Sequence, residues 1–311
     1  MKSSNIGGQA VMEGIMMRSG DQYSIGVRKP DGEIEVKVEP YRSWAKDSSI
    51  WKLPVFRGVA SFFESLVVGI RCLMYSASFI EDEEEDAKKP GKEKTEEQKE
   101  KEEKWLMYGT MTFSVIFSIA LFIMLPYFLA GFLRNVTTSE GVIAVAEACV
   151  RMILFLGYLV LISRMKDIQR VFMYHGAEHK CINCVEHGLE LNVENVMKSS
   201  REHKRCGTSF LLFVMIVSII FFLFIRVSSP VLRVVIRLLL MPVIAGVSYE
   251  IIRLAGKSDN KIVALLSKPG LMLQHLTTRE PEPEMAEVAI AAVEAVFDWK
   301  GYVEKIRQEE V

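Results

Sequence analysis

Long apolar runs alternate with short charged segments along this chain. Four runs have the length of a membrane-crossing helix: Tyr108–Leu133, Val142–Ile162, Phe210–Ile225 and Val231–Ile252. A bilayer core about 30 Å thick is crossed by roughly 20 apolar residues in a helix. The pattern therefore predicts an all-α polytopic membrane protein with about four transmembrane helices.

Two of these runs contain charged residues. The second run carries Glu147 and Arg151, and the fourth carries Arg233, Arg237 and Glu250. A charge within a bilayer is costly unless it is paired. At about 1.5 Å per residue, Glu147 and Arg237 lie at similar depth, so we expect them to pair between helices. Arg233 is the alternative partner, and Arg151 can reach Glu147 within one helix. The functional alternative is a polar pathway for an ion or substrate.

The segment 56–80 is apolar but amphipathic. Its charged residues Arg57, Glu64 and Arg71 recur at intervals of seven and fall on one stripe of a helix. This pattern predicts a helix at the membrane surface, with a fifth crossing helix as the alternative. The next segment, 81–104, holds twelve acidic residues and seven lysines without apolar periodicity. That composition is typical of a solvated, disordered linker, with a partly helical segment as the alternative.

The N-terminal segment 1–55 is predicted to be a small β-rich cytoplasmic element. Tyr23–Arg28 and Glu33–Val38 flank Lys29-Pro30-Asp31-Gly32, which is a turn sequence between two strand patterns. The preceding segment, residues 7–14, is too rich in glycine for a stable helix.

The remaining chain divides into a four-helix membrane domain, 105–257, and a cytoplasmic tail, 258–311. In the tail, Glu284–Glu309 has apolar residues at intervals of three to four, which predicts an amphipathic helix. The loop 163–207 contains eight Lys and Arg residues, whereas the loop between the first two spans contains only Arg134. Cytoplasmic loops carry this excess. We therefore expect a multi-pass protein of the cell membrane, with 163–207 and both termini in the cytoplasm.

Composition limits the partners. Half of the residues are hydrophobic, mean hydropathy is +0.20, and 38 Lys and Arg residues oppose 39 Asp and Glu residues. We expect the lipid bilayer as a partner and no nucleic acid. The first 20 residues lack the apolar segment of a secretory signal peptide. A membrane-protein partner and a peptide- or lipid-like substrate both fit, and the oligomeric state is left open.

Candidate chemistry is concentrated in the loop 163–207, which contains four of the five histidines. His175 and His179 are four residues apart and share a helix face, so both can bind one ion. Glu178 completes an H-x-x-E-H pattern, in which two histidines bind zinc and the glutamate acts as general base. His203 and Cys206 are the candidate third ligands. The alternative to a metal site is a histidine pair that faces solvent or forms hydrogen bonds within the protein.

A second pattern in this loop, Cys181-x-x-Cys184, lacks the second pair that a four-cysteine zinc site needs. It predicts two reduced thiols packed beside the site.

The histidine-rich pattern predicts a site for a divalent metal, Zn²⁺. Glu178 is the predicted catalytic residue, and the predicted metal ligands are His175, His179, His203 and Cys206. Three ligands with an open position indicate catalysis, whereas a closed set of four indicates a structural ion.

Four motifs resemble the YqhQ-like family of bacterial multi-pass membrane proteins. They are Gly7–Arg18, Tyr174–Lys180, Arg205–Phe210 and Leu276–Pro281. The resemblance covers almost the whole chain and implies a bacterial cytoplasmic membrane and a metal-dependent enzyme. Cys181 and Lys204 depart from the family pattern, which more often has Thr and Pro there, and this argues against Cys181 as a ligand.

The resulting hypothesis is a zinc-dependent hydrolase with its metal site at the cytoplasmic face of the membrane. The alternative is a non-enzymatic assembly, insertion or scaffold factor in which the metal only fixes the 163–207 loop. A third hypothesis, a transporter, rests on the charges within the apolar runs.

Overall fold

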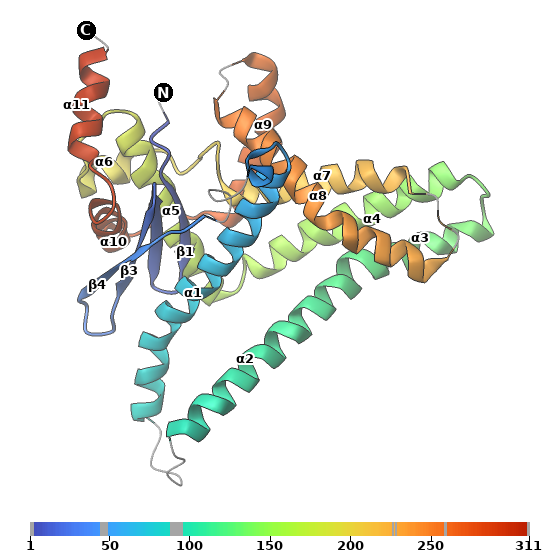
Figure 1. Ribbon diagram of the computed structural model, residues 1–311, viewed down its shortest axis with the longest axis horizontal. Coiled ribbons are helices and arrows are strands. Elements are labelled where there is room, and N and C mark those ends of the chain that lie inside the picture. The colour runs from blue at the N-terminus through green and yellow to red at the C-terminus, as the bar shows by residue number, and fades with distance from the viewer. Residues whose placement is uncertain are drawn as a thin grey trace. The chain divides into compact units, whose positions relative to one another are not determined.

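The computed structural model describes residues 3–43, 49–87, 96–225, 227, 229–257 and 260–309. Helices dominate, and a small sheet lies near the N-terminus (Figure 1). The strands are β1 (Gly7–Val11), β2 (Gly14–Ser19), β3 (Gln22–Arg28) and β4 (Ile34–Pro40). The long helices are α1 (Phe56–Ala87), α2 (Glu96–Ile119), α4 (Glu140–Ile162), α5 (Lys166–Glu186), α7 (Gly207–Leu223), α8 (Pro230–Lys257) and α9 (Lys261–Thr277). The shorter helices are η2 (Ile50–Lys52), η3 (Ala120–Met124), α3 (Leu125–Gly131), η4 (Phe132–Asn135), α6 (Val193–Lys198), α10 (Pro283–Glu294) and α11 (Trp299–Glu309).

The chain forms two compact units. The first comprises Met1–Glu83, Val160–Val217 and Pro242–Val311, and the second comprises Glu84–Leu159 and Ser218–Met241. The first unit contains the sheet and the histidine-bearing helix α5. The second contains the ion pairs of α4 and α8.

The sheet is an antiparallel meander in the order β1-β2-β3-β4. The hairpin predicted from the turn sequence is confirmed as β3 and β4, with Gly32 at a φ of 88°. The glycine-rich segment before it forms β1, which pairs with β2 in a register that places Ala10 opposite Ile15.

Side chains alternate between the two faces of this sheet, as strand geometry requires. Ile15 and Met17 pack with residues of α5 and α10, whereas Met16, Ile25 and Val27 belong to a second cluster with Cys72 of α1. The central strands β2 and β3 are therefore buried on both faces of the sheet.

Small residues allow α10 to lie close to the sheet. A Cβ on Gly26 would lie 3.2 Å from the carbonyl oxygen of Val288 in α10. Two residues nearer the β2–β3 turn, on the same face, the hydroxyl of Ser24 donates to the carbonyl of Ala292 at 2.6 Å. This close packing fixes the C-terminal tail against the N-terminal strands.

The predicted single amphipathic helix Glu284–Glu309 is wrong, because α10 ends at Glu294 and α11 begins at Trp299. Asp298 precedes α11, and its carboxylate accepts a hydrogen bond from the backbone N–H of Gly301 at 3.1 Å. Such a cap begins a new helix. The apolar periodicity continued across the break because Val296 and Trp299 both pack against the same core.

The charged segment 81–104, predicted to be disordered, is helical where it is described. Helix α1 extends to Ala87 and α2 begins at Glu96. The centre of this predicted linker, 88–95, lies outside the described residues. Lys and Glu have high helix propensity, so a charged composition without apolar periodicity does not exclude a helix.

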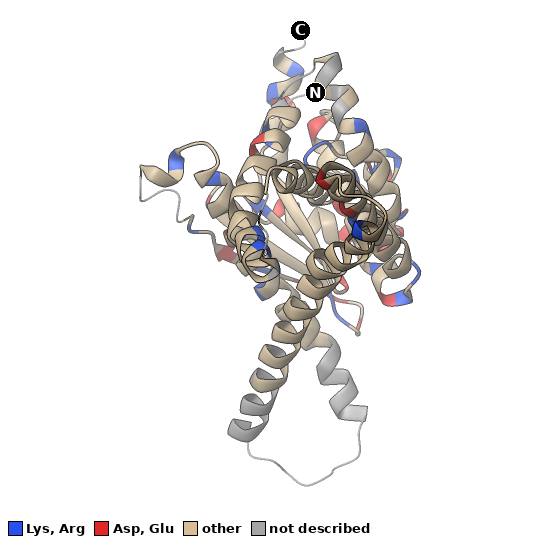
Figure 2. Ribbon diagram, turned by 90° about the vertical axis from the view of Figure 1, so that its right-hand side faces the viewer, with Lys and Arg blue, Asp and Glu red and all other residues tan. Residues whose placement is uncertain are grey.

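Four helices are long and apolar enough to cross a membrane: Phe56–Phe79, Tyr108–Asn135, Glu140–Ile162 and Val231–Gly256. Figure 2 shows long stretches of helical ribbon in tan, without charged residues. Three agree with the predicted spans. The predicted span Phe210–Ile225 instead corresponds to α7, a shorter apolar helix of 17 residues.

The additional long apolar helix lies in α1. The sequence predicted a surface helix there, with a membrane-crossing helix as the alternative. Two members of its charged stripe have partners within the protein. Arg57 donates to Glu250 at 2.6 Å, and Glu64 accepts from the hydroxyls of Tyr41 at 2.5 Å and Ser43 at 2.9 Å. These contacts account for the charges of Arg57 and Glu64 without requiring lipid headgroups around them.

In the second unit, the predicted pairing of Glu147 with Arg237 is confirmed. Nη1 of Arg237 lies 2.5 Å from Oε1 of Glu147, and Nη2 donates to Oε2 at 3.0 Å. Arg151 also donates to Glu147, at 2.8 Å within α4. Arg233, the alternative partner, instead donates to the carbonyl of Val227.

Candidate metal centre

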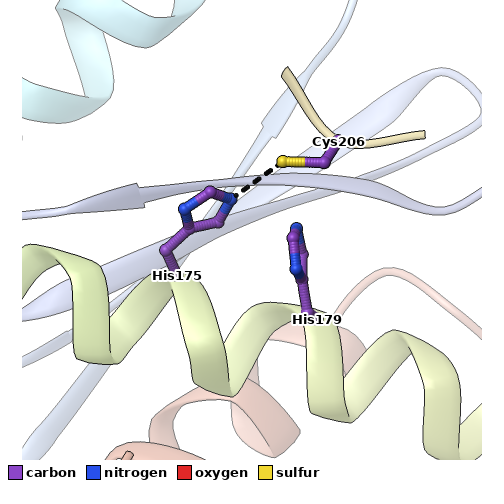
Figure 3. Close-up of side chains that lie close together, drawn as sticks. All are labelled: His175, His179 and Cys206. Carbon is purple, nitrogen blue, oxygen red and sulfur yellow. Dashed lines mark hydrogen bonds between the residues drawn. The ribbon is translucent and has the colours of Figure 1, made fainter. Parts of the chain in front are cut away.

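Helix α5 and the start of α7 bring three ligand-type side chains together. His175 and His179 project from one face of α5 toward Cys206 (Figure 3). The ligand atoms of the three residues lie within 4.8 Å of one another, and Sγ of Cys206 is 3.3 Å from Nε2 of His175. Among the residues that the structure describes, this is the only such cluster of His, Cys, Asp and Glu.

Backbone carbonyls orient both imidazole rings. Nδ1 of His175 lies 2.8 Å from the carbonyl oxygen of Thr277, and Nδ1 of His179 lies 2.5 Å from that of Arg201. A carbonyl only accepts hydrogen bonds, so each Nδ1 carries the proton and each Nε2 keeps its lone pair. Histidine ligands of metal ions are typically held in this way.

Cys206 immediately precedes α7 and is buried. The backbone N–H of Thr208 donates to its sulfur at 3.3 Å. The N-terminal end of a helix carries partial positive charge, which stabilises negative charge nearby. A thiolate is the form of cysteine that binds metal ions, so this position suits a ligand.

His203 is not part of the three-residue cluster. Its backbone N–H donates to Oε1 of Gln274 at 2.9 Å, and its carbonyl accepts from Nε2 of the same side chain at 2.8 Å. The ring lies 5.6 Å from that of His179, and its Nε2 is 3.6 Å from Oε2 of Glu186. The structure thus brings together three of the four predicted ligands.

Glu186 is a buried acid that the sequence analysis missed. Its Oε1 accepts from the backbone N–H and the hydroxyl of Ser4, both at 2.7 Å, and from Arg205. Burial by itself would raise the pKa of Glu186, but the neighbouring His203, Arg205 and Ser4 outweigh it and lower the pKa to about 2. No local pattern marks this glutamate, because its partners are distant in sequence.

Glu178 is buried, and its Oε2 has no hydrogen-bond partner within the described structure. Burial raises its pKa to about 7, against the opposing effect of His175. Strand β1 passes over it, since a Cβ on Gly8 would lie 2.7 Å from Cδ of Glu178. The carboxylate is not one of the three clustered ligands. It is a desolvated acid beside them.

Gly176 allows the segment after α9 to approach α5. A Cβ at this position would lie 1.9 Å from the carbonyl oxygen of Arg279. The backbone N–H of Arg279 donates to the carbonyl of Phe172 in α5 at 2.8 Å. This contact positions Thr277, two residues earlier, at His175.

Two further side chains of α5 hold the segment that orients His179. Nζ of Lys180 donates to the carbonyls of Met197 and Ser199, and Nδ2 of Asn183 donates to those of Ser200 and Glu202. The carbonyl of Arg201, which accepts from His179, lies within this segment.

Cys181 and Cys184 face the apolar core that α5 shares with the sheet and α10. Both are free and buried, and burial raises the pKa of each thiol above its usual value. They are therefore poorly suited as ligands, in agreement with the prediction of two reduced thiols packed beside the site.

The three donors can hold one divalent ion. Two imidazole nitrogens and a sulfur are ligands that Zn²⁺ prefers, and three protein ligands leave one position of a tetrahedron open. The donor set therefore fits the predicted metal, with His203 outside the set.

Comparison with known proteins identifies the family. Residues 53–299 match the family described as "Protein of unknown function (DUF1385)". The chain is 39% identical over 286 residues to the "Uncharacterized protein YqhQ" of Bacillus subtilis (strain 168), covering 91% of this chain and 89% of that protein. No solved structure matches. The resemblance expected from the four motifs is confirmed, and the chain belongs to the DUF1385 family together with its YqhQ relative.

Proposed function

We propose that this protein is a zinc-dependent hydrolase of the bacterial cytoplasmic membrane, with its metal site at the cytoplasmic face. The observation that carries the proposal is the set of three donors: His175, His179 and Cys206, with both Nε2 lone pairs available. His203 lies outside this set, so the site has the ligand count of a catalytic zinc.

The protein residues would divide the work of hydrolysis. A bound zinc ion supplies a water nucleophile at neutral pH and polarises the substrate oxygen. Glu178, whose Oε2 lacks a partner, receives the proton released as water attacks and returns it to the leaving group. The carbonyls of Thr277 and Arg201 keep the two imidazoles in the tautomer that binds metal. A peptide- or lipid-like substrate fits the membrane setting.

The second candidate is a membrane assembly or insertion factor with a structural metal. It is favoured by the burial of His179 and Cys206, each of which is at most 4% exposed. In this case the ion joins α5 to the start of α7 and turns over no substrate.

Metal analysis of purified protein tests the site. We expect stoichiometric zinc in the wild type and its loss in His175→Ala, His179→Ala and Cys206→Ser. His203→Ala and His275→Ala are matched controls that should keep the metal, because both histidines lie outside the cluster. Equal metal content in all variants, including none in the wild type, would remove the basis of the proposal.

Glu178→Gln separates the two candidates. The substitution preserves size and removes the base, so a hydrolase should keep zinc and fail to complement a deletion of the gene. Full complementation by the zinc-loaded Gln variant would rule out the hydrolase and favour the structural role.

A further inference from the structure

The second unit contains a cavity of about 550 Å³, lined by residues of α3, η4, α4, α7 and α8. Its charged lining residues are unbalanced, with four arginines against two glutamates: Arg134, Arg151, Arg233, Arg237, Glu140 and Glu147. The cavity therefore has an excess of two positive charges.

The unbalanced charge is buried. Glu147, Arg151 and Arg237 are 6%, 3% and 3% exposed, and both guanidiniums share the one carboxylate. Nε of Arg237 is buried and has no hydrogen-bond partner within the described structure. A buried net charge is strongly unfavourable unless a counter-charge accompanies it. The carboxylate of Glu147 neutralises only one of these two guanidiniums.

Arg233 is the third guanidinium of this group. Among the described residues, no carboxylate neutralises its charge. It donates to the carbonyl of Val227 at 2.6 Å from Nη2 and 3.1 Å from Nε, and lies over the ring of Tyr127. Arg134 is matched by Glu140, 3.0 Å away. The excess positive charge therefore belongs to Arg151, Arg233 and Arg237.

The rest of the lining is largely apolar. The guanidiniums of Arg151 and Arg237 each lie 4.8 Å from the centroid of the Phe222 ring, and Ile219 and Leu223 extend this surface. An anionic group attached to an apolar chain would contact both parts of the lining.

We propose that this cavity binds a phosphate group with about two negative charges, either the monoester headgroup of a lipid or free inorganic phosphate. Guanidinium forks match the oxygen geometry of phosphate. A phosphate monoester carries a charge of about −1.5 to −2 at neutral pH, which matches the excess of two positive charges in the lining. The cavity accommodates a phosphate beside Phe222, and Nε of Arg237 supplies a donor that lacks a partner.

Thermal unfolding of the purified full-length chain in neutral detergent tests this site. The probes are dioleoyl phosphatidic acid, inorganic phosphate and, as the control, dioleoyl phosphatidylcholine. At a hundredfold excess over its Kd, a ligand of the folded state should raise the Tm of this 311-residue chain by roughly 4 °C. Phosphatidic acid alone would indicate a lipid source, and inorganic phosphate a free one. Equal shifts with phosphatidylcholine, or no shift with any probe, would overturn the proposal.

Charge variants give the specific test. Arg233→Gln should weaken phosphate binding roughly tenfold, since one charge-assisted contact is lost. Arg253→Gln is the matched control, because Arg253 lies on the same helix outside the cavity lining and should leave binding unchanged. Equal affinity in Arg233→Gln and the wild type would contradict the assignment.

Glu147→Gln gives a result of opposite sign. It raises the positive excess of the lining, so the folded variant should bind phosphate more tightly than the wild type, even though its ion pairs are lost. Weaker binding in this variant would show that Glu147 does not compete with the phosphate, and would overturn the charge-balance argument. If Glu147→Gln does not fold, Arg233→Gln still decides the question.

Discussion

Replacement of Gly176 by alanine should disturb the metal centre without changing any ligand. The new Cβ would lie 1.9 Å from the carbonyl oxygen of Arg279, so the backbone after α9 has to move. That movement withdraws the carbonyl of Thr277 from Nδ1 of His175, which are 2.8 Å apart. The glycine is therefore linked to the orientation of a ligand that lies one residue away.

The loss of folding stability in Gly176→Ala has two contributions. Overpacking against a fixed neighbour costs about 1–3 kcal/mol. Loss of one buried hydrogen bond adds about 1 kcal/mol. The sum, roughly 2–4 kcal/mol, corresponds to a fall in Tm of roughly 3–6 °C for a chain of 311 residues. Loss of the group that orients a metal ligand weakens metal binding by roughly 10- to 100-fold.

The assay compares Gly176→Ala with Gly157→Ala in detergent-purified protein. Gly157 is also within a helix, but a Cβ there would have no neighbour within 4 Å, so alanine should maintain or slightly raise the Tm. Zinc affinity is measured by competition with a fluorescent chelator, and should fall only in Gly176→Ala. If both variants bind zinc as the wild type does, the proposed link from Gly176 to His175 is refuted.

Three further predictions concern other parts of the chain. Glu147→Gln should destabilise the protein by about 3–5 kcal/mol, and adding Arg237→Gln should cost little more; a double-mutant cycle without coupling would refute the pair. The depressed pKa of Glu186, about 2, means that its stabilising effect is complete above its unfolded pKa and is lost as pH falls toward 2. Glu186→Gln should therefore flatten the acid limb of a Tm-against-pH profile, and an unchanged profile would exclude this role. Cysteine labelling should place 163–207 and both termini in the cytoplasm, and labelling of position 190 from outside would reverse that orientation.

Local patterns in the sequence identified several elements of this fold. The turn at Lys29–Gly32 predicted the β3–β4 hairpin, and the four-residue spacing of His175 and His179 predicted two rings on one helix face. The need to neutralise charge in apolar helices predicted the pair of Glu147 and Arg237. Each inference depends on spacing within one element or on the cost of an isolated charge, and both are properties that a sequence displays directly.

The choice between the candidate third ligands could not be made in this way. His203 and Cys206 are three residues apart and equally suitable by spacing. Gln274, 71 residues away, binds the backbone of His203 on both sides, and the imidazole ring lies beside Glu186 rather than with the other ligands. Cys206 has the position beside His175. A long-range contact thus places Cys206 rather than His203 in the three-residue cluster, and no short pattern contains that contact.

The four motifs that carry the family resemblance acquire a common meaning in the structure. Gly8 gives β1 room above Glu178, and Gly176 gives Arg279 room against α5. Cys206 provides the sulfur, and the carbonyl of Thr277 orients His175 across 102 residues of sequence. If these glycines served only the packing of the fold, they could lie at close contacts anywhere in the protein. Here both glycines allow a close approach to α5 within two residues of a clustered histidine, so the geometry around one cluster of side chains accounts for all four motifs.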